Sequence, residues 1–264
     1  MNTVNPLFHR SELLLGHEAM QRIHDTRVII FGVGGVGSWC AEALVREGIG
    51  HLTLVDADDV CITNCNRQLM ATASTIGEPK VEALRRRLLD VNPEADITAI
   101  KCRYSEQTAE TFHLATYDYV IDAIDSLRDK ISLVLRTTAI AAERRQSGQD
   151  ASQQGQEPGP VLFSSMGAAL RIDPTKVAVS EFWRVTGDRL AAAMRSAMRR
   201  QGTFPARKFL CVHSLEPPLP NLGTAAGAEP SSGKGGPNGS LAHVTGIFGL
   251  TLAGLVIEHL TGRR

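Results

Sequence analysis

The stretch Val28-Ile29-Ile30-Phe31-Gly32-Val33-Gly34-Gly35-Val36-Gly37-Ser38 decides how this chain folds. Its first four residues are apolar and mostly β-branched, which predicts a buried parallel strand. The glycines at 32, 34 and 37 follow in Gly-x-Gly-x-x-Gly spacing. In a nucleotide-binding turn, the first glycine permits the turn, the second lets backbone approach a phosphate, and the third lets a helix pack on the strand. The stretch therefore predicts a phosphate-binding turn between a strand and a helix, without identifying the nucleotide.

Alternating strand and helix patterns continue on both sides of this turn. Strands are expected at 28–31, 51–55, 96–102 and 117–121, and helices at 11–24, 38–45, 80–91 and 128–144. This alternation predicts an α/β fold, a Rossmann-like doubly wound and mainly parallel sheet, with its ligand beyond the carboxyl ends of the strands.

The last third of the chain predicts a C-terminal β/α extension of the same single domain, residues 1–264. Strands are expected at 161–166, 176–182 and 208–213, and helices at 188–200 and 240–260. The segments 146–160 and 221–239 are rich in Gly, Pro, Ser, Ala and Gln, which predicts flexible loops. The uncharged run 244–257 is shorter than the roughly 20 residues that span a bilayer, so we expect a buried helix, its glycines packed against the sheet.

Charge and cysteine content exclude several classes of protein. The chain has 28 Lys and Arg against 28 Asp and Glu, so RNA binding needs a local group of cations. The densest group comprises Arg184, Arg189, Arg195, Arg199, Arg200, Arg207 and Lys208. This group could bind RNA, or it could simply form the solvated face of a helix. Five cysteines without a pair of Cys-x-x-Cys motifs indicate neither a disulfide framework nor a zinc site. With no apolar run before Arg10, a reducing cytoplasm is expected.

Acidic residues follow two of the expected strands. Asp56 lies about 20 positions after the glycine turn, where this fold places a carboxylate on the ribose hydroxyls; an acidic strand cap is the alternative. Asp58 and Asp59 share its loop and could hold a divalent cation beside a triphosphate. Asp125 follows the second of these strands, 117–121, at the same edge.

Cations distinguish ATP from a nicotinamide dinucleotide as the ligand. Arg67 and Lys80 lie on the expected phosphate side, where splitting a triphosphate needs positive charge and hydride transfer does not. None of the three tyrosines has a lysine four residues on, so the Tyr-Lys pair of short-chain dehydrogenases is missing. The alternative interpretation is that Arg67 and Lys80 are ordinary surface charges with no role in binding.

Five motifs occur in a fixed order: Gly32-x-Gly34-Gly35-x-Gly37-Ser38, Val55-Asp56-Ala57-Asp58, Asn64-x-x-Arg67-Gln68, Gly77-x-Pro79-Lys80 and Asp122-x-x-Asp125. Together they resemble the ThiF/MoeB-type adenylating domain of the ubiquitin-activating superfamily. The segments 10–16, 122–130 and 212–218 and the final helix are more similar to the tRNA threonylcarbamoyladenosine dehydratases of that superfamily. Adenylation of the C-terminus of a ubiquitin-like sulfur-carrier protein is the alternative activity.

The resemblance implies that ATP with Mg²⁺ activates the threonyl carboxylate of a modified adenosine beside the tRNA anticodon. The carbamoyl group then closes a ring with net loss of water. It implies that Gly32, Gly34, Gly35, Gly37, Asp56 and Asp58 bind the nucleotide, that Asn64, Arg67 and Lys80 hold its phosphates, and that Asp125 acts near the α-phosphate or the metal. Arg10 would reach the phosphates from the same or a second subunit.

The resemblance further implies a homodimer and sulfur-relay proteins of the cysteine desulfurase system as partners. No residue set is expected to bind a resident metal ion. Cys211 lies in a strand-like run and is expected to be a buried apolar residue rather than a nucleophile. No cysteine occurs in Asn238-Gly239-Ser240-Leu241, which excludes a thioester step at that position.

Overall fold

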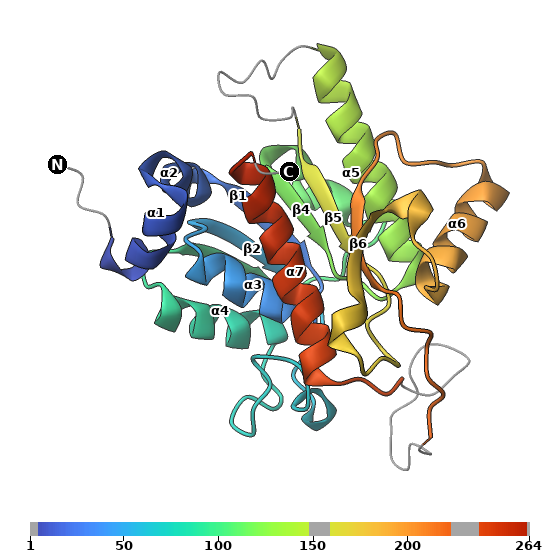
Figure 1. The fold of residues 1–264 in the computed structure, drawn as a ribbon, viewed down its shortest axis with the longest axis horizontal. Coiled ribbons are helices and arrows are strands. Elements are labelled where there is room, and N and C mark those ends of the chain that lie inside the picture. Colours follow the sequence, from blue (N-terminus) through green and yellow to red (C-terminus); the bar gives the residue numbers. More distant parts are fainter. Residues whose placement is uncertain (1–4, 148–158, 223–237, 263–264) are drawn as a thin grey trace.

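A seven-stranded sheet in the order β3-β2-β1-β4-β5-β7-β6 forms the centre of the molecule (Figure 1). The computed structural model describes residues 5–147, 159–222 and 238–262, so most of the two expected flexible loops lies outside the described residues. The strands are β1 Arg27–Phe31, β2 His51–Val55, β3 Asp96–Ile100, β4 Tyr119–Asp122, β5 Val161–Ser165, β6 Val177–Glu181 and β7 Leu210–Ser214. All pairs are parallel except β6 with β7, which confirms the expected doubly wound sheet.

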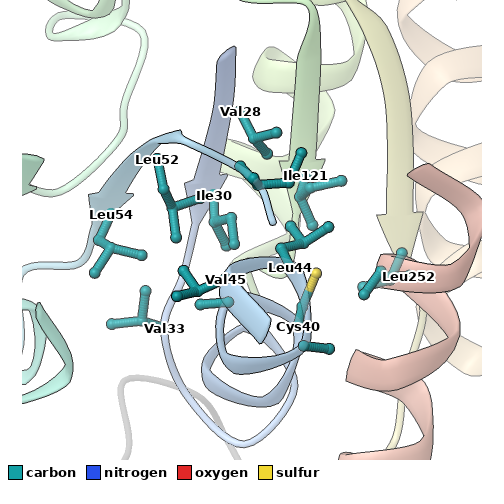
Figure 2. Packing of buried hydrophobic residues seen from close by; sticks show 14 of the residues in the cluster. Val28, Ile30, Val33, Cys40, Leu44, Val45, Leu52, Leu54, Ile121 and Leu252 are labelled. Atoms are coloured by element: carbon teal, nitrogen blue, oxygen red, sulfur yellow. The ribbon is translucent and has the colours of Figure 1, made fainter. Parts of the chain in front are cut away.

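Side chains of β1 alternate between the two faces of the sheet and so contribute to two cores. Val28 and Ile30 belong to the core between the sheet and α3, α4 and α7, part of which Figure 2 shows. Ile29 and Phe31 belong to the core on the opposite face, under α5 and α6. Because both faces are covered, the strand reads as a continuous apolar run rather than as an alternating one.

The principal helices divide between these two faces. One face carries α3 Gly37–Arg46, α4 Lys80–Val91 and α7 Ala242–Leu260, and the other α5 Leu127–Ser147 and α6 Arg189–Gln201. Short 3-10 helices occupy Pro6–Phe8, Ile62–Asn64, Ala109–Phe112, Leu114–Thr116, Pro174–Lys176 and Phe182–Arg184. The strands and helices after residue 160 form the expected C-terminal extension.

One helix was expected over 11–24, and this prediction is wrong. The chain forms α1 His9–Leu15 and α2 His17–Asp25, separated by Gly16 with φ +84°. A left-handed residue cannot continue a right-handed helix, and glycine adopts that conformation without steric cost.

The last helix, α7, packs across α3. Among the described helices it alone is long and apolar enough to cross a membrane, yet 56% of its most apolar stretch is buried within the fold. A Cβ on Gly249 would lie 2.4 Å from the carbonyl oxygen of Val36 and 2.8 Å from the Cβ of Trp39. Gly249 thus packs on the start of α3 and not on the sheet as expected, while the space around Gly254 is open.

Candidate functional site

The glycine turn lies between the carboxyl ends of β1 and β4. Gly32 has φ +84°, and a Cβ there would lie 2.6 Å from the carbonyl oxygen of Ala123, directly after β4. A Cβ on Gly37 would lie 1.9 Å from the carbonyl oxygen of Gly32. At Gly34, by contrast, the nearest atom to such a Cβ is Nε2 of Gln68 at 3.7 Å. The first and third glycines are therefore required by packing, and the second leaves room for a ligand beside the backbone.

The start of α3 adjoins this open position. Ser38 Oγ donates to the carbonyl of Gly34 (2.6 Å) and accepts from the backbone N–H of Leu69 (3.2 Å). A Cβ on Gly35 would lie 3.2 Å from Thr245 of α7 and 3.3 Å from Cγ of Arg67. A helix N-terminus with free N–H groups and adjacent open backbone is a site that binds anions such as phosphates.

Asp56, which follows β2, binds the glycine turn through its carboxylate. Oδ2 accepts from the N–H of Val33 (2.9 Å) and Oδ1 from the N–H of Asp58 (2.9 Å). Burial raises the pKa of Asp56, while the nearby Lys80 ammonium and the two N–H donors oppose the rise. The side chain is thus placed at the turn, where the ribose was expected to bind.

Two lysines engage the carboxylates that follow Asp56. Nζ of Lys80, at the start of α4, lies 2.7 Å from Oδ2 of Asp58; the lysine side chain is 7% exposed and the aspartate 69%. Lys101 pairs with Asp59 at 2.6 Å. Within residues 5–147, 159–222 and 238–262, no three His, Cys, Asp or Glu side chains form a group suited to a metal ion. Asp58 and Asp59 therefore each form an ion pair with a lysine.

Arg67 lies in the loop between β2 and α4 and is half-buried. Its Nη1 donates to the carbonyl of Thr63 (3.0 Å) and to Oδ1 of Asn66 (2.9 Å), and burial lowers its pKa. The indole of Trp39 on α3 donates to the carbonyl of Arg67 (3.1 Å), which ties this loop to the glycine turn. Asn64 Oδ1 accepts from the N–H of Cys61 (3.0 Å), so that amide shapes the same loop.

Asp125 is exposed on the turn between β4 and α5. Beneath it, Asp122 accepts from Ser164 Oγ (2.6 Å) and lies 2.9 Å from Nζ of Lys130. The same Nζ donates to the carbonyl of Ile124 (3.0 Å). The buried residues of this turn shape the backbone, and Asp125 is the carboxylate left on its outer side.

Arg103 was not predicted as a site residue. Its Nη2 lies 2.7 Å from Oδ2 of Asp129, which raises the pKa of Arg103, and the carboxylates of Asp125 and Asp58 add to this rise. Arg103 therefore lies near the loops after β2 and β4. A signal was present: Arg103 follows β3, whose carboxyl end shares this edge of the sheet. The buried Gln68 is a second candidate, because its Oε1 has no hydrogen-bond partner in the described structure.

Arg10 is not brought to this edge by a single chain. It is exposed on α1, and the carbonyl of His24 on the adjoining α2 accepts from the N–H of Gly50 (3.1 Å), directly before β2 begins. These helices therefore lie at the amino ends of the strands, opposite the glycine turn (Figure 1). A contribution from Arg10 to the site stays a prediction that requires a second subunit.

Cys211 on β7 is wholly buried, and burial raises the pKa of its thiol far above the usual range. The expected apolar role is confirmed, and a thiol kept protonated in this way is a poor nucleophile.

Comparison with known proteins agrees with this geometry. Residues 8–264 match the ThiF family. The tRNA threonylcarbamoyladenosine dehydratase of Bacillus subtilis is 40% identical over 195 residues, which are 74% of this chain and 70% of that protein. The Haemophilus influenzae dehydratase is 32% identical over 255 residues, covering 94% and 90% of the two chains.

A solved structure shares the whole fold. The Escherichia coli tRNA N6-threonylcarbamoyladenosine dehydratase in complex with AMP superimposes with a TM-score of 0.78 at 31% identity, covering 97% of this chain and 94% of that one. The chain therefore belongs to the ThiF family and, within it, to the tRNA threonylcarbamoyladenosine dehydratases.

Proposed function

We propose that this protein removes water from N6-threonylcarbamoyladenosine in tRNA, beside the anticodon, in a reaction driven by ATP. The observation on which the proposal rests is the open backbone at Gly34, beside which Asp56 and Arg67 contact the glycine turn and α3. Lys80 pairs with Asp58 in the loop that follows Asp56. These residues fit a nucleoside triphosphate, and the similarity to a dehydratase structure extends over 97% of this chain.

The threonyl carboxylate of the substrate would attack the α-phosphorus of ATP bound there. This step releases pyrophosphate and forms an acyl-adenylate, from which AMP leaves when the ring closes. Gly34, Gly35 and the N-terminus of α3 would bind the α-phosphate, and Arg67, Lys80 and Asn64 the phosphates beyond it. Lys80 is shielded from water by its burial, so its charge acts strongly on a phosphate beside it. Because the attacking carbamoyl group belongs to the same nucleotide as the activated carboxylate, ring closure is effectively unimolecular.

Asp125 and Arg10 complete the proposed site. Asp125, exposed at the same edge, would act near the α-phosphate or Mg²⁺, and the Mg²⁺ would arrive with the triphosphate, since magnesium sites combine one or two carboxylates with substrate phosphates. Arg10 would come from the second subunit of a homodimer. We further propose a cytoplasmic location and sulfur-relay proteins as partners, both carried over from the family.

Mass spectrometry of tRNA nucleosides tests the function. Incubation of tRNA with enzyme, ATP and Mg²⁺, under conditions that do not open the ring, should convert threonylcarbamoyladenosine into a product lighter by one water. Arg67→Ala and Asp125→Ala should abolish this conversion without unfolding the protein. No loss of water with the intact enzyme would refute the proposal.

ATP–pyrophosphate exchange separates the proposal from sulfur-carrier adenylation. Exchange should depend on modified tRNA. Exchange that depends instead on a small protein ending in Gly-Gly would favour the carrier reaction.

A further inference from the structure

An exposed pair of aromatic rings lies beside an arginine, on the far side of the sheet from α3. Trp183 is 37% exposed and Phe204 is 55% exposed, with ring centroids 6.1 Å apart. The guanidinium carbon of Arg199, on the last turn of α6, lies 5.6 Å from the centre of the Trp183 ring. We name Trp183, Phe204 and Arg199 the aromatic platform.

Buried neighbours hold the platform in place. Phe182 is wholly buried and stacks on Phe209 with centroids 5.0 Å apart. Arg195 donates to the carbonyl of Phe182 (3.0 Å) and lies over its ring. Arg195 is thus engaged in packing, whereas Arg199 is exposed above Trp183. A fixed aromatic surface loses little conformational entropy when a ligand binds it.

The surroundings of the platform are strongly cationic. Between residues 181 and 208 the chain has seven Lys and Arg and only two carboxylates, Glu181 and Asp188. Both carboxylates are engaged by the protein itself: Glu181 accepts from the N–H of Trp183 (3.0 Å), and Asp188 from Ala191 (2.8 Å) and Gly167 (3.0 Å). Arg184 and Lys208, together with Glu181, line an adjoining hollow of about 350 Å³.

A groove of about 820 Å³ lies between α5 and α6. Its lining includes three arginines and two carboxylates, Glu106 and Asp129, which pair with Arg128 (3.6 Å) and Arg103 (2.7 Å). Leu127 and Arg128, directly after the Asp125 turn, line one part of it; Arg200 and Thr203, directly before Phe204, line another.

We propose that the aromatic platform stacks unpaired bases of the substrate tRNA, while the groove between α5 and α6 follows the RNA backbone toward Asp125. The inference rests on the proposed function, which supplies tRNA as the ligand. Exposed aromatic rings with arginine bind unpaired bases irrespective of sequence, and the surrounding cations complement phosphates.

Paired substitutions test the platform. In the double variant Trp183→Leu, Phe204→Leu the apolar bulk remains but the rings are lost, and we expect at least a tenfold rise in Kd for modified tRNA. The matched variant Trp183→Phe, Phe204→Tyr keeps the rings and should stay within about threefold of the intact protein. ATP affinity and the thermal midpoint serve as checks on folding. Arg199→Gln should lower the slope of log K against log salt by about one.

If the leucine variant does not fold, photo-crosslinking of tRNA to the intact protein tests the platform instead. Adducts should lie on the peptides that contain Trp183 or Phe204, and adducts confined to other peptides would overturn the inference. Unchanged tRNA affinity in a folded leucine variant would also overturn it. A changed molecular mass in light scattering, with unchanged tRNA affinity, would assign the surface to protein contacts instead.

Failure of the platform proposal and failure of the proposed dehydration reaction give different results. If the intact protein binds tRNA through the platform but removes no water, the proposed reaction fails and the platform stands. If it removes water while the leucine variant binds tRNA normally, only the platform fails.

Discussion

Nζ of Lys130 lies 2.9 Å from Oδ2 of Asp122, and neither side chain has any exposed surface. Ser164 Oγ donates to the same carboxylate oxygen at 2.6 Å, and the N–H of Ile124 donates to the other at 3.1 Å. Both carboxylate oxygens are therefore hydrogen-bonded, and additional hydrogen bonds of this kind are what make a buried ion pair tolerable. It fixes the backbone of the turn from which Asp125 projects.

Replacing Lys130 by Met should lower the free energy of unfolding by about 3–5 kcal/mol, because Asp122 would keep its buried charge without a partner. Urea denaturation measures the loss. Arg86→Met is the control, since Arg86 pairs with Glu78 at the surface and such a pair contributes at most about 1 kcal/mol. Equal effects of the two substitutions would contradict the importance of the buried pair.

The third glycine of the turn should not tolerate a methyl group. A Cβ on Gly37 would lie 1.9 Å from the carbonyl oxygen of Gly32, so Gly37→Ala is expected to displace α3 and to weaken ATP binding at least tenfold. Gly254→Ala in α7 has open space and helical backbone, and should raise stability by roughly 0.5–1 kcal/mol. Calorimetric titration with ATP, together with thermal unfolding, distinguishes the two results.

Lys80→Met should lower turnover by about 100-fold while leaving the fold intact. The lysine is buried, but its partner Asp58 is 69% exposed and remains hydrated when the lysine is removed. Arg46→Met, which removes an exposed arginine paired with Glu42, is the control for loss of a cation. Turnover of the Lys80 variant within threefold of the intact enzyme would remove the lysine from the site.

The pH dependence of stability should contain a contribution from Glu47. Oε2 of Glu47 is buried without a hydrogen-bond partner, and burial raises its pKa to about 7. The folded state therefore favours the protonated form, and this stabilisation, fully present below the ordinary glutamate pKa, is lost as pH rises through about 7. Glu47→Gln should be about 1–3 kcal/mol more stable than the parent at pH 8 and nearly equal to it at pH 4.5. Thermal midpoints across that range measure the difference, and parallel curves would contradict it.

Mixing two inactive variants tests whether Arg10 acts across a dimer. Arg10 lies at the opposite edge of the sheet from Asp125, so a site formed by two chains can be intact in a mixed dimer of Arg10→Ala with Asp125→Ala. Random exchange of subunits should restore roughly a quarter of the intact activity. No recovery after exchange, confirmed by mass, would show that the two residues do not act across such a dimer.

Local patterns predicted much of the fold. The helix expected at 80–91 and the strand at 51–55 have those bounds in the structure, since each is set by short-range periodicity and by a proline or an acidic residue at its end. The single helix expected at 11–24 was wrong because Gly16 interrupts an otherwise helical pattern with a left-handed conformation.

The site residues that were not predicted are those whose position depends on contacts between segments distant in sequence. Asp56, Lys80 and Asp125 were predicted because each follows a strand or starts a helix at one edge. Arg103 was missed because its proximity to Asp125 and Asp58 arises from the order of β3 and β4 in the sheet. The approach of Thr245 to Gly35 was not predicted either, because it arises only when α7 packs on α3.

The packing of α7 on α3 also makes the glycine turn depend on a part of the chain that is far away in sequence. Gly249 and Thr245 of α7 pack against Val36 and Gly35. Without α7, this face of the central sheet loses one of the helices that cover it. Contacts between residues so far apart in sequence form slowly, because a long loop must close first, so we expect the glycine turn to reach its final packing late in folding.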